Sequence, residues 1–185
     1  MSLPHALLTS LLEQPCAGMD LARRFERSIG FFWPATHQQI YKELGKLEAA
    51  GWVSSAAEEG ARGRKRRYEV LPAGKQELQR WVAESDDPPP LRDALMVRLR
   101  AEAALGTGAG VENDLRHRLA RHRAQLALYE AIEQRDFSGR ELSAAEQLQH
   151  LILQSGLATE REQMHFCEKA LALLAALHPA SAQVP

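Results

Sequence analysis

The sequence of 185 residues contains few cysteines and few aromatic side chains. Its two cysteines, Cys16 and Cys167, are far apart and form neither a disulfide framework nor a CxxC metal motif. Two reduced, partly buried thiols are typical of a cytoplasmic protein. Aromatic residues make up 6% of the chain, whereas alanine and leucine are abundant, and this balance favours helices over sheets.

Signals for a membrane or for export are missing as well. No apolar run is long enough to span a bilayer, and the chain does not start with a basic segment, a short apolar stretch and a cleavage site. We therefore expect a cytoplasmic protein with no membrane partner.

The sequence also lacks the common motifs of catalysis. It contains no HExxH, Walker loop, GxGxxG, Ser-His-Asp set or pair of catalytic carboxylates, so we expect neither an enzyme nor a cofactor. His117 and His122 are five residues apart, a poor spacing for two ligands on one helix face, and no metal site is predicted.

Charge is unevenly distributed between the two halves of the chain. Residues 1–84 contain 12 Lys or Arg and 10 Asp or Glu, a net charge of +2, whereas residues 85–185 contain 11 and 14, a net charge of −3. Together they give the overall net charge of −1. A basic half joined to an acidic half is compatible with a DNA-reading domain and a regulatory domain.

The segment 34–51 is the most informative part of the sequence. Thr36 can accept a hydrogen bond from the backbone N–H of Gln39, and Gln39 can reach back to Thr36, which is a capping box at a helix start. Gly51 suits the helix end. One buried stripe is predicted for Ile40, Leu44 and Leu47.

The opposite face of this helix is polar or small, at Gln38, Lys42, Gly45 and Ala49. We interpret it as a recognition helix for the DNA major groove. Its first turns carry three candidates for contacts to base edges, His37, Gln38 and Lys42, while Tyr41 is a candidate phosphate or sugar contact. Each of these residues, taken singly, could also be an exposed polar side chain without a role.

A basic loop follows the recognition helix. The segment 62–67 holds five cations in six positions, and it lies between two short predicted strands. Such a segment can be a solvated loop, but after a capped polar helix it is typical of the wing of a winged helix-turn-helix domain, where cations contact phosphates. The predicted DNA-binding residues are Thr36, His37, Gln38, Tyr41, Lys42, Arg62, Arg64, Lys65 and Arg67.

We predict a mainly α-helical protein: an N-terminal winged helix-turn-helix with a small β-hairpin wing, and an all-helical C-terminal domain. The expected divisions are a DNA-binding domain over 1–84, a Pro-rich spacer over 85–90, a helical dimerisation and effector domain over 91–178 and a disordered tail over 179–185.

The last predicted helix, ending at about residue 177, is unusually long, which indicates pairing with another helix. Its apolar residues fall in two rows of heptad spacing, and Glu160 interrupts one row, so we expect a crossed or antiparallel contact rather than a zipper. The dimer candidates on this helix are Leu153, Leu157, Met164, Cys167, Leu171 and Leu174.

Two tryptophans are weak candidates for stacking a flat effector, Trp33 and Trp81. Packing in the core is the more ordinary role for both, and the effector-binding residues are otherwise unknown.

Four stretches together resemble the PadR family of transcriptional regulators: residues 17–22, 32–41, 47–53 and 66–74. The resemblance implies a dimeric winged-helix repressor of palindromic operators, in which small aromatic molecules can release DNA. It also implies that the first helix joins the dimer contact, which makes Leu7 and Leu11 candidates. Where the family usually has Thr at the start of the fourth helix, this chain has Leu71, which removes a side-chain cap worth roughly 1 kcal/mol.

A rival hypothesis is a winged-helix module that holds protein partners, with the long helix as a scaffold and without sequence-specific DNA binding. The basic wing and the polar face of Gln38 and Lys42 favour DNA, because a protein-docking module would not need them.

Overall fold

The computed structural model describes residues 3–57, 65–85, 87, 90, 92–106 and 110–177. The chain divides into two compact units, Met1–Pro89 and Pro90–Pro185. The expected disordered tail, over 179–185, lies outside the described residues.

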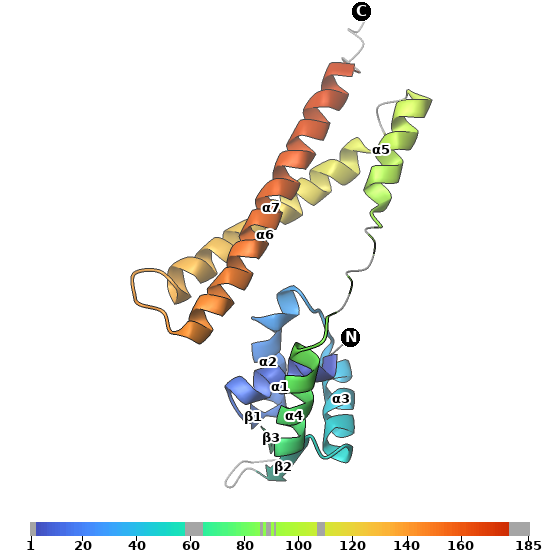
Figure 1. The fold of residues 1–185 in the computed structure, drawn as a ribbon. Coiled ribbons are helices and arrows are strands. Elements are labelled where there is room, and N and C mark those ends of the chain that lie inside the picture. The colour runs from blue at the N-terminus through green and yellow to red at the C-terminus, as the bar shows by residue number, and fades with distance from the viewer. Residues whose placement is uncertain are drawn as a thin grey trace, which may run out of the picture. The chain divides into compact units, whose positions relative to one another are not determined.

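The N-terminal unit is a winged helix-turn-helix domain, as the sequence predicted (Figure 1). Its third helix begins directly after Thr36 and is followed by two strands of the wing. In chain order its elements are α1 (Leu3–Glu13), β1 (Cys16–Ala17), α2 (Gly18–Glu26), the short 3-10 helix η1 (Ile29–Phe31), α3 (His37–Ala49), β2 (Val53–Ala57), β3 (Arg66–Val70) and α4 (Pro72–Val82).

The wing has one more strand than the sequence predicted. The sheet is antiparallel with strand order β1-β3-β2, so β3 pairs with both of the other strands. In this register Tyr68 on β3 lies opposite Cys16 on one side and Ser55 on the other. The strand β1 thereby attaches the wing to the segment between α1 and α2.

Leucines of the first three helices form the core of the N-terminal unit around Phe25, whose side chain is fully buried. This burial supplies the main stabilisation, at about 25 cal/mol for each Å² of apolar surface removed from water. The fully buried residues of this core include Leu7, Leu8, Leu11, Leu21, Ala22, Ile40 and Leu44.

A glycine lets α4 approach the end of α3 closely. A Cβ atom at Gly74 would lie 2.3 Å from the backbone oxygen of Trp52, far inside van der Waals contact. We expect Gly74→Ala to lower the free energy of unfolding by about 1–3 kcal/mol, because the backbone must shift. The matched variant Gly45→Ala, on α3 with no atom within 4 Å of the new Cβ, should instead raise it by up to about 1 kcal/mol. Urea denaturation of both variants measures the difference, and equal stabilities would contradict the close approach.

The described residues of the C-terminal unit form three helices, α5 (Ala94–Leu105), α6 (Glu112–Asp136) and α7 (Ala144–Leu177). Figure 1 shows α6 and α7 crossing as a helical hairpin. Its main core cluster has five buried residues, Leu95, Val111, Leu115, Leu119 and Cys167, so all three helices contribute. Among the described residues, none of the helices has both the length and the apolar character of a membrane span.

Polar pairs join α6 to α7 along the hairpin. His122 Nδ1 lies 2.5 Å from Glu160 Oε2, and His150 Nε2 lies 2.8 Å from Glu133 Oε1. Two arginine pairs, Arg123–Glu168 at 2.7 Å and Arg161–Glu130 at 3.1 Å, also cross between the helices. These contacts fix which residues of the two helices face each other.

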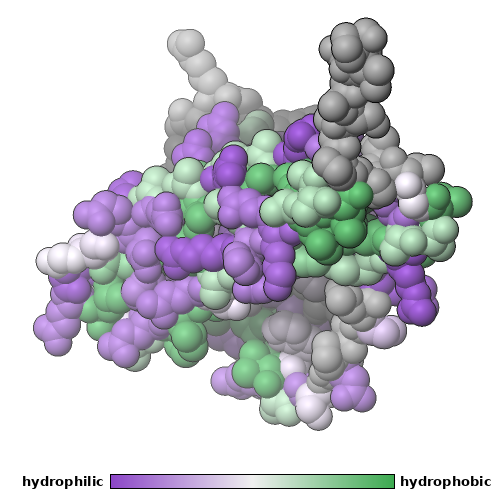
Figure 2. Space-filling view, turned by 90° about the horizontal axis from the view of Figure 1, so that it is seen from above, coloured by the Kyte–Doolittle hydropathy of each residue, from purple (hydrophilic) through white to green (hydrophobic). Residues whose placement is uncertain are grey.

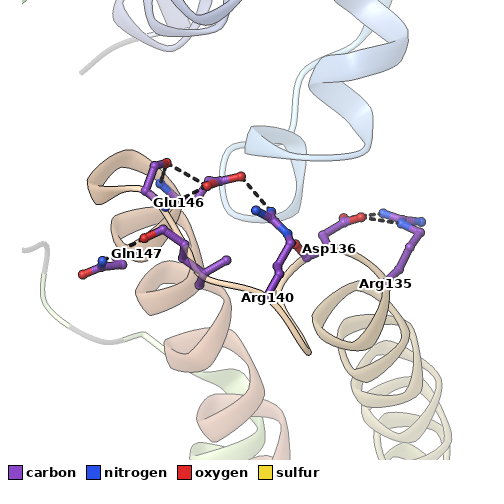
Figure 3. Close-up of polar contacts among 7 residues, drawn as sticks. Arg135, Asp136, Arg140, Glu146 and Gln147 are labelled. Carbon is purple, nitrogen blue, oxygen red and sulfur yellow. Dashed lines mark hydrogen bonds and ion pairs between the residues drawn. The ribbon is translucent and has the colours of Figure 1, made fainter.

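The loop between α6 and α7 is held by a charged network at the start of α7 (Figure 3). Arg140 donates to the backbone oxygen of Asp136 at 2.7 Å and to Glu146 Oε1 at 2.7 Å. Glu146 Oε2 also accepts hydrogen bonds from the backbone N–H of Ser143, at 2.9 Å, and from its hydroxyl, at 2.7 Å. The hydrogen bond from Arg140, and then those from Ser143, lower the pKa of Glu146 to about 2.

This network predicts acid sensitivity of the C-terminal unit. Because the pKa of Glu146 in the folded protein lies below the ordinary value of 4.5, its contribution is complete above about pH 4.5 and is lost as the pH falls toward 2. We expect Glu146→Gln to flatten the fall in stability over that range. Thermal unfolding followed by circular dichroism at several pH values checks this, and equal acid sensitivity of the two proteins would contradict it.

Candidate nucleic-acid interface

The start of α3 is built as the sequence predicted. The backbone N–H of Gln39 donates to Thr36 Oγ1 at 3.2 Å, and the N–H of Thr36 donates to Gln39 Oε1 at 2.8 Å. This capping box satisfies two backbone donors that a helix start would otherwise leave unpaired. At the other end Gly51 has a φ of 70°, a left-handed conformation that favours glycine. The ends of the helix are thus defined locally.

The two faces of α3 differ as predicted. Ile40 and Leu44 are fully buried, whereas Gln38 and Lys42 are exposed. The exposed side chains lie within the first two turns of the helix, where helix-turn-helix proteins contact base edges.

Tyr41 is positioned by a glycine of α2. It is 43% exposed, and its ring packs so closely on Gly18 that a Cβ there would lie 2.8 Å from Tyr41 Cε1. The same added Cβ would lie 3.4 Å from Cε2 of Tyr68. The start of α2, the recognition helix and the wing therefore meet at Gly18.

His37 is less available for a base contact than the sequence suggested. Its Nε2 atom lies 2.8 Å from Glu26 Oε1, at the end of α2, and has no well-aligned hydrogen bond. A contact of His37 with a base would require this pair to separate.

The wing cations that the structure describes are also close to carboxylates. Lys65 Nζ lies 3.3 Å from Asp20 Oδ2, and Arg67 Nε lies 3.8 Å from Glu69 Oε1. The predicted contacts Arg62 and Arg64 fall outside the described residues.

The sequence interpretation missed the acidic partners of this surface. Asp20 lies in the first turn of α2, where acidic residues are common because their negative charge interacts favourably with the helix dipole. Glu48 is on α3, and it accepts hydrogen bonds from the wing strands β2 and β3. No local sequence signal distinguishes these two from other surface carboxylates, since their partners are distant in the chain.

Comparison with known proteins identifies the family. The chain is 36% identical to a probable transcriptional regulator of Mycobacterium tuberculosis over 181 residues, which cover 91% of this chain and 95% of that protein. Residues 7–80 match the transcriptional regulator PadR-like family. This chain belongs to the PadR-like family. Its residues 91–175 match a second family, named for the C-terminal part of a virulence activator.

Solved PadR-family structures have the same fold over nearly the whole chain. The virulence activator AphA of Vibrio cholerae superposes with a TM-score of 0.81 at 28% identity, and the match covers 95% of this chain and 99% of AphA. PadR of Bacillus subtilis, solved in complex with operator DNA, superposes with a TM-score of 0.80 at 25% identity and covers 94% of this chain and 99% of that one. Membership of this family makes the protein a transcriptional regulator and not an enzyme.

In this PadR-family protein the predicted dimer residues lie mostly inside their own units. Leu7 and Leu11 have no exposed surface, and Leu157 and Cys167 are 2% and 1% exposed. Met164, Leu171 and Leu174 are partly buried against the core of the C-terminal unit, and Leu153 is half-buried. The heptad rows of α7 thus contribute mainly to intramolecular packing, and the four fully buried side chains offer no surface to a second chain.

Other apolar side chains of the C-terminal unit are exposed instead. Figure 2 shows apolar groups reaching the surface between polar ones. On α7 these residues are Leu148, Leu151, Ile152, Leu173 and Leu177, and on α5 they are Met96, Val97 and Leu105. Six of these eight are at least 59% exposed: Val97, Leu105, Leu148, Leu151, Leu173 and Leu177.

The two effector candidates have different surroundings. Trp33 packs against the core of the N-terminal unit. Trp81 is 36% exposed and stacks on His5, with ring centroids 4.6 Å apart and planes 8° apart. His5 is held in turn by Glu77 at 3.0 Å, and the hydrogen bonds from Arg80 and then His5 lower the pKa of Glu77 to about 2.

A hollow of about 370 Å³ lies elsewhere on the N-terminal unit, and neither tryptophan lines it. Arg24 at its wall donates to the side chain of Gln14 at 2.9 Å and to its backbone oxygen at 2.8 Å. Burial raises the pKa of the Cys16 thiol in this hollow. Among the described residues no three His, Cys, Asp or Glu side chains converge as a metal site would require.

Proposed function

We propose that the protein acts in the cytoplasm as a homodimeric repressor that binds an inverted-repeat operator and is released by a small aromatic effector. The observation that carries the proposal is the exposed polar face of α3, at Gln38 and Lys42, on the same unit as a basic wing. The solved complex of Bacillus subtilis PadR with operator DNA supports it, since that protein has the same fold.

In this proposal α3 lies in the major groove and the wing lies along the backbone. Gln38 can pair bidentately with adenine, and Lys42 can donate to O6 and N7 of guanine. Tyr41 contacts a phosphate or sugar. The wing residues Lys65 and Arg67, with Arg62 and Arg64, neutralise phosphates, which gives affinity and register but no sequence choice.

The dimer contact that we propose uses the exposed apolar side chains of α5 and α7. Large apolar groups that remain exposed on a folded unit are typical of an interaction surface. A two-fold axis repeats the recognition helix, so the operator is an inverted repeat with half-sites about one or two helical turns apart.

Repression and its relief follow the Bacillus subtilis relative, which is named a negative transcriptional regulator and was also solved with p-coumaric acid. An effector that binds one arrangement of the dimer better than another shifts the population and changes the separation of the recognition helices. The exposed face of Trp81 is our candidate surface for such a ring.

The test uses the DNA upstream of the gene that encodes this chain. Fluorescence anisotropy compares that duplex with a shuffled duplex of equal composition at physiological salt, and sedimentation gives the stoichiometry. We expect two chains on each upstream duplex and binding at least tenfold tighter than to shuffled DNA. Equal affinity for both duplexes would support the rival function, a protein-docking module.

A promoter–reporter assay then tests the direction of regulation. We expect expression to rise when the gene for this chain is deleted and p-coumaric acid to reproduce that rise. A fall in expression on deletion would identify an activator, as AphA is named, and would contradict repression.

A further inference from the structure

Each described cation of the wing lies beside a carboxylate of the same unit. The same is true of His37 and Lys46 on α3. Lys42 is different, because it forms no ion pair with any part of the chain that the structure describes. The pairs are His37–Glu26 at 2.8 Å, Lys46–Glu43 at 2.7 Å, Lys65–Asp20 at 3.3 Å, Arg66–Glu48 at 3.0 Å and Arg67–Glu69 at 3.8 Å.

We propose that Asp20 and Glu48 limit the affinity of this surface for DNA: they hold the wing cations Lys65 and Arg66 in the free protein and compete with DNA phosphates for them. This inference rests on the proposed function, since it concerns how tightly the same surface binds DNA. Neither carboxylate contacts DNA in this scheme.

Glu48 joins the recognition helix to two strands of the wing, β2 and β3. Its Oε1 atom accepts a hydrogen bond from Ser55 Oγ on β2 at 2.5 Å and from Arg66 on β3 at 3.0 Å. A side chain of α3 therefore helps to fix the position of the wing relative to α3. Its charge and its hydrogen bonds are separable, because glutamine keeps the accepting oxygen.

Asp20 joins the other side of the wing to α2. The side chains of Asp20 and Lys65 are 48% and 42% exposed, so the pair is solvated. Exposed ion pairs contribute little to stability, and phosphates can exchange for the carboxylate at small cost. Asp20 lies in the first turn of α2, where a negative charge interacts favourably with the helix dipole.

The consequence can be followed for the two kinds of DNA complex. Non-specific binding depends almost wholly on phosphate contacts and counterion release, so a cation that is already paired contributes less. Operator binding adds contacts to base edges, which do not depend on these cations. Because these pairs stabilise the unbound protein, which is the reference state for both complexes, the carboxylates weaken binding to arbitrary DNA and to the operator by a similar factor.

The experiment compares Asp20→Asn and Glu48→Gln with the wild type on the upstream duplex and the shuffled duplex, over a range of salt. The control is Glu84→Gln, which also removes one negative charge from the N-terminal unit. Glu84 pairs with Arg80 near the end of α4 and not with a wing cation. We expect Asp20→Asn and Glu48→Gln each to bind both duplexes about 3- to 10-fold tighter than the wild type does, by a similar factor for the two duplexes. The slope of log K against log salt should steepen by up to about 0.9 for each cation released.

Three results would overturn the inference. One is that Asp20→Asn and Glu48→Gln both keep the wild-type affinity for shuffled DNA and the wild-type salt slope, while the wild type still prefers upstream DNA. Another is an equal gain in Glu84→Gln, which would make the effect one of net charge alone. If the wild type binds neither duplex, the proposed function fails and this inference fails with it.

Discussion

Replacing Phe25 by alanine is expected to lower the free energy of unfolding of the N-terminal unit by about 3–5 kcal/mol. Phe25 is the largest of the fully buried side chains, and its removal leaves a cavity among the leucines of the first three helices. A loss of this size is a large fraction of the 5–15 kcal/mol that typically stabilises a domain. The wing and α3 pack on the same core, so DNA binding should fail at the same urea concentration.

Tryptophan fluorescence in urea measures this loss selectively, because all three tryptophans, Trp33, Trp52 and Trp81, lie in the N-terminal unit. The control is Phe32→Ala, since Phe32 is 60% exposed and its removal should change stability by no more than about 0.5 kcal/mol. Similar midpoints for the two variants would show that the core is organised differently.

Reversing the charge of Lys42 is expected to weaken operator binding about 10- to 100-fold. Lys42 is exposed on the polar face of α3 and forms no ion pair within the described part of the chain, so no internal pair must separate before it contacts DNA. A good contact between a side chain and a base is worth about 1–3 kcal/mol of discrimination. Lys42→Glu removes that contact and adds repulsion from the phosphates.

The matched control is Lys75→Glu, which makes the same charge change at an exposed position of α4, outside α3 and the wing. Anisotropy on the upstream duplex should show a small loss for Lys75→Glu and a large loss for Lys42→Glu, with unchanged urea midpoints for both. Equal losses would mean that Lys42 acts through net charge, and that the base contact assigned to it is wrong.

Local signals made the N-terminal unit predictable from the sequence. The capping box of Thr36 and Gln39, the stripe at Ile40 and Leu44, and the stop at Gly51 each depend on residues within one helix. Such features depend only on residues that are close together in the chain, so they can be recognised in the sequence. The two-residue strand β1 was not predicted, because it exists only through its pairing with β3, some fifty residues later.

The partners of side chains were much less predictable. The heptad rows of α7 correctly indicated a helix packed along its length, but periodicity does not say whether the other helix belongs to the same chain. Here the core contact of Cys167 is with the chain's own α5 and α6. The pairs of Asp20 with Lys65 and of Glu48 with Arg66 were missed for the same reason, since each joins elements that only the fold brings together.

The cross-helix pairs of α6 and α7 also constrain how this protein can change during evolution. Inserting or deleting a single residue between His122 and Glu133, or between His150 and Glu160, would rotate one pair by about 100° relative to the other, so the two pairs could not both form. Length changes in the loop between Asp136 and Ser143 would leave those alignments intact. We therefore expect homologues to differ in the length of that loop and to keep the number of residues between the paired positions on α6 and on α7.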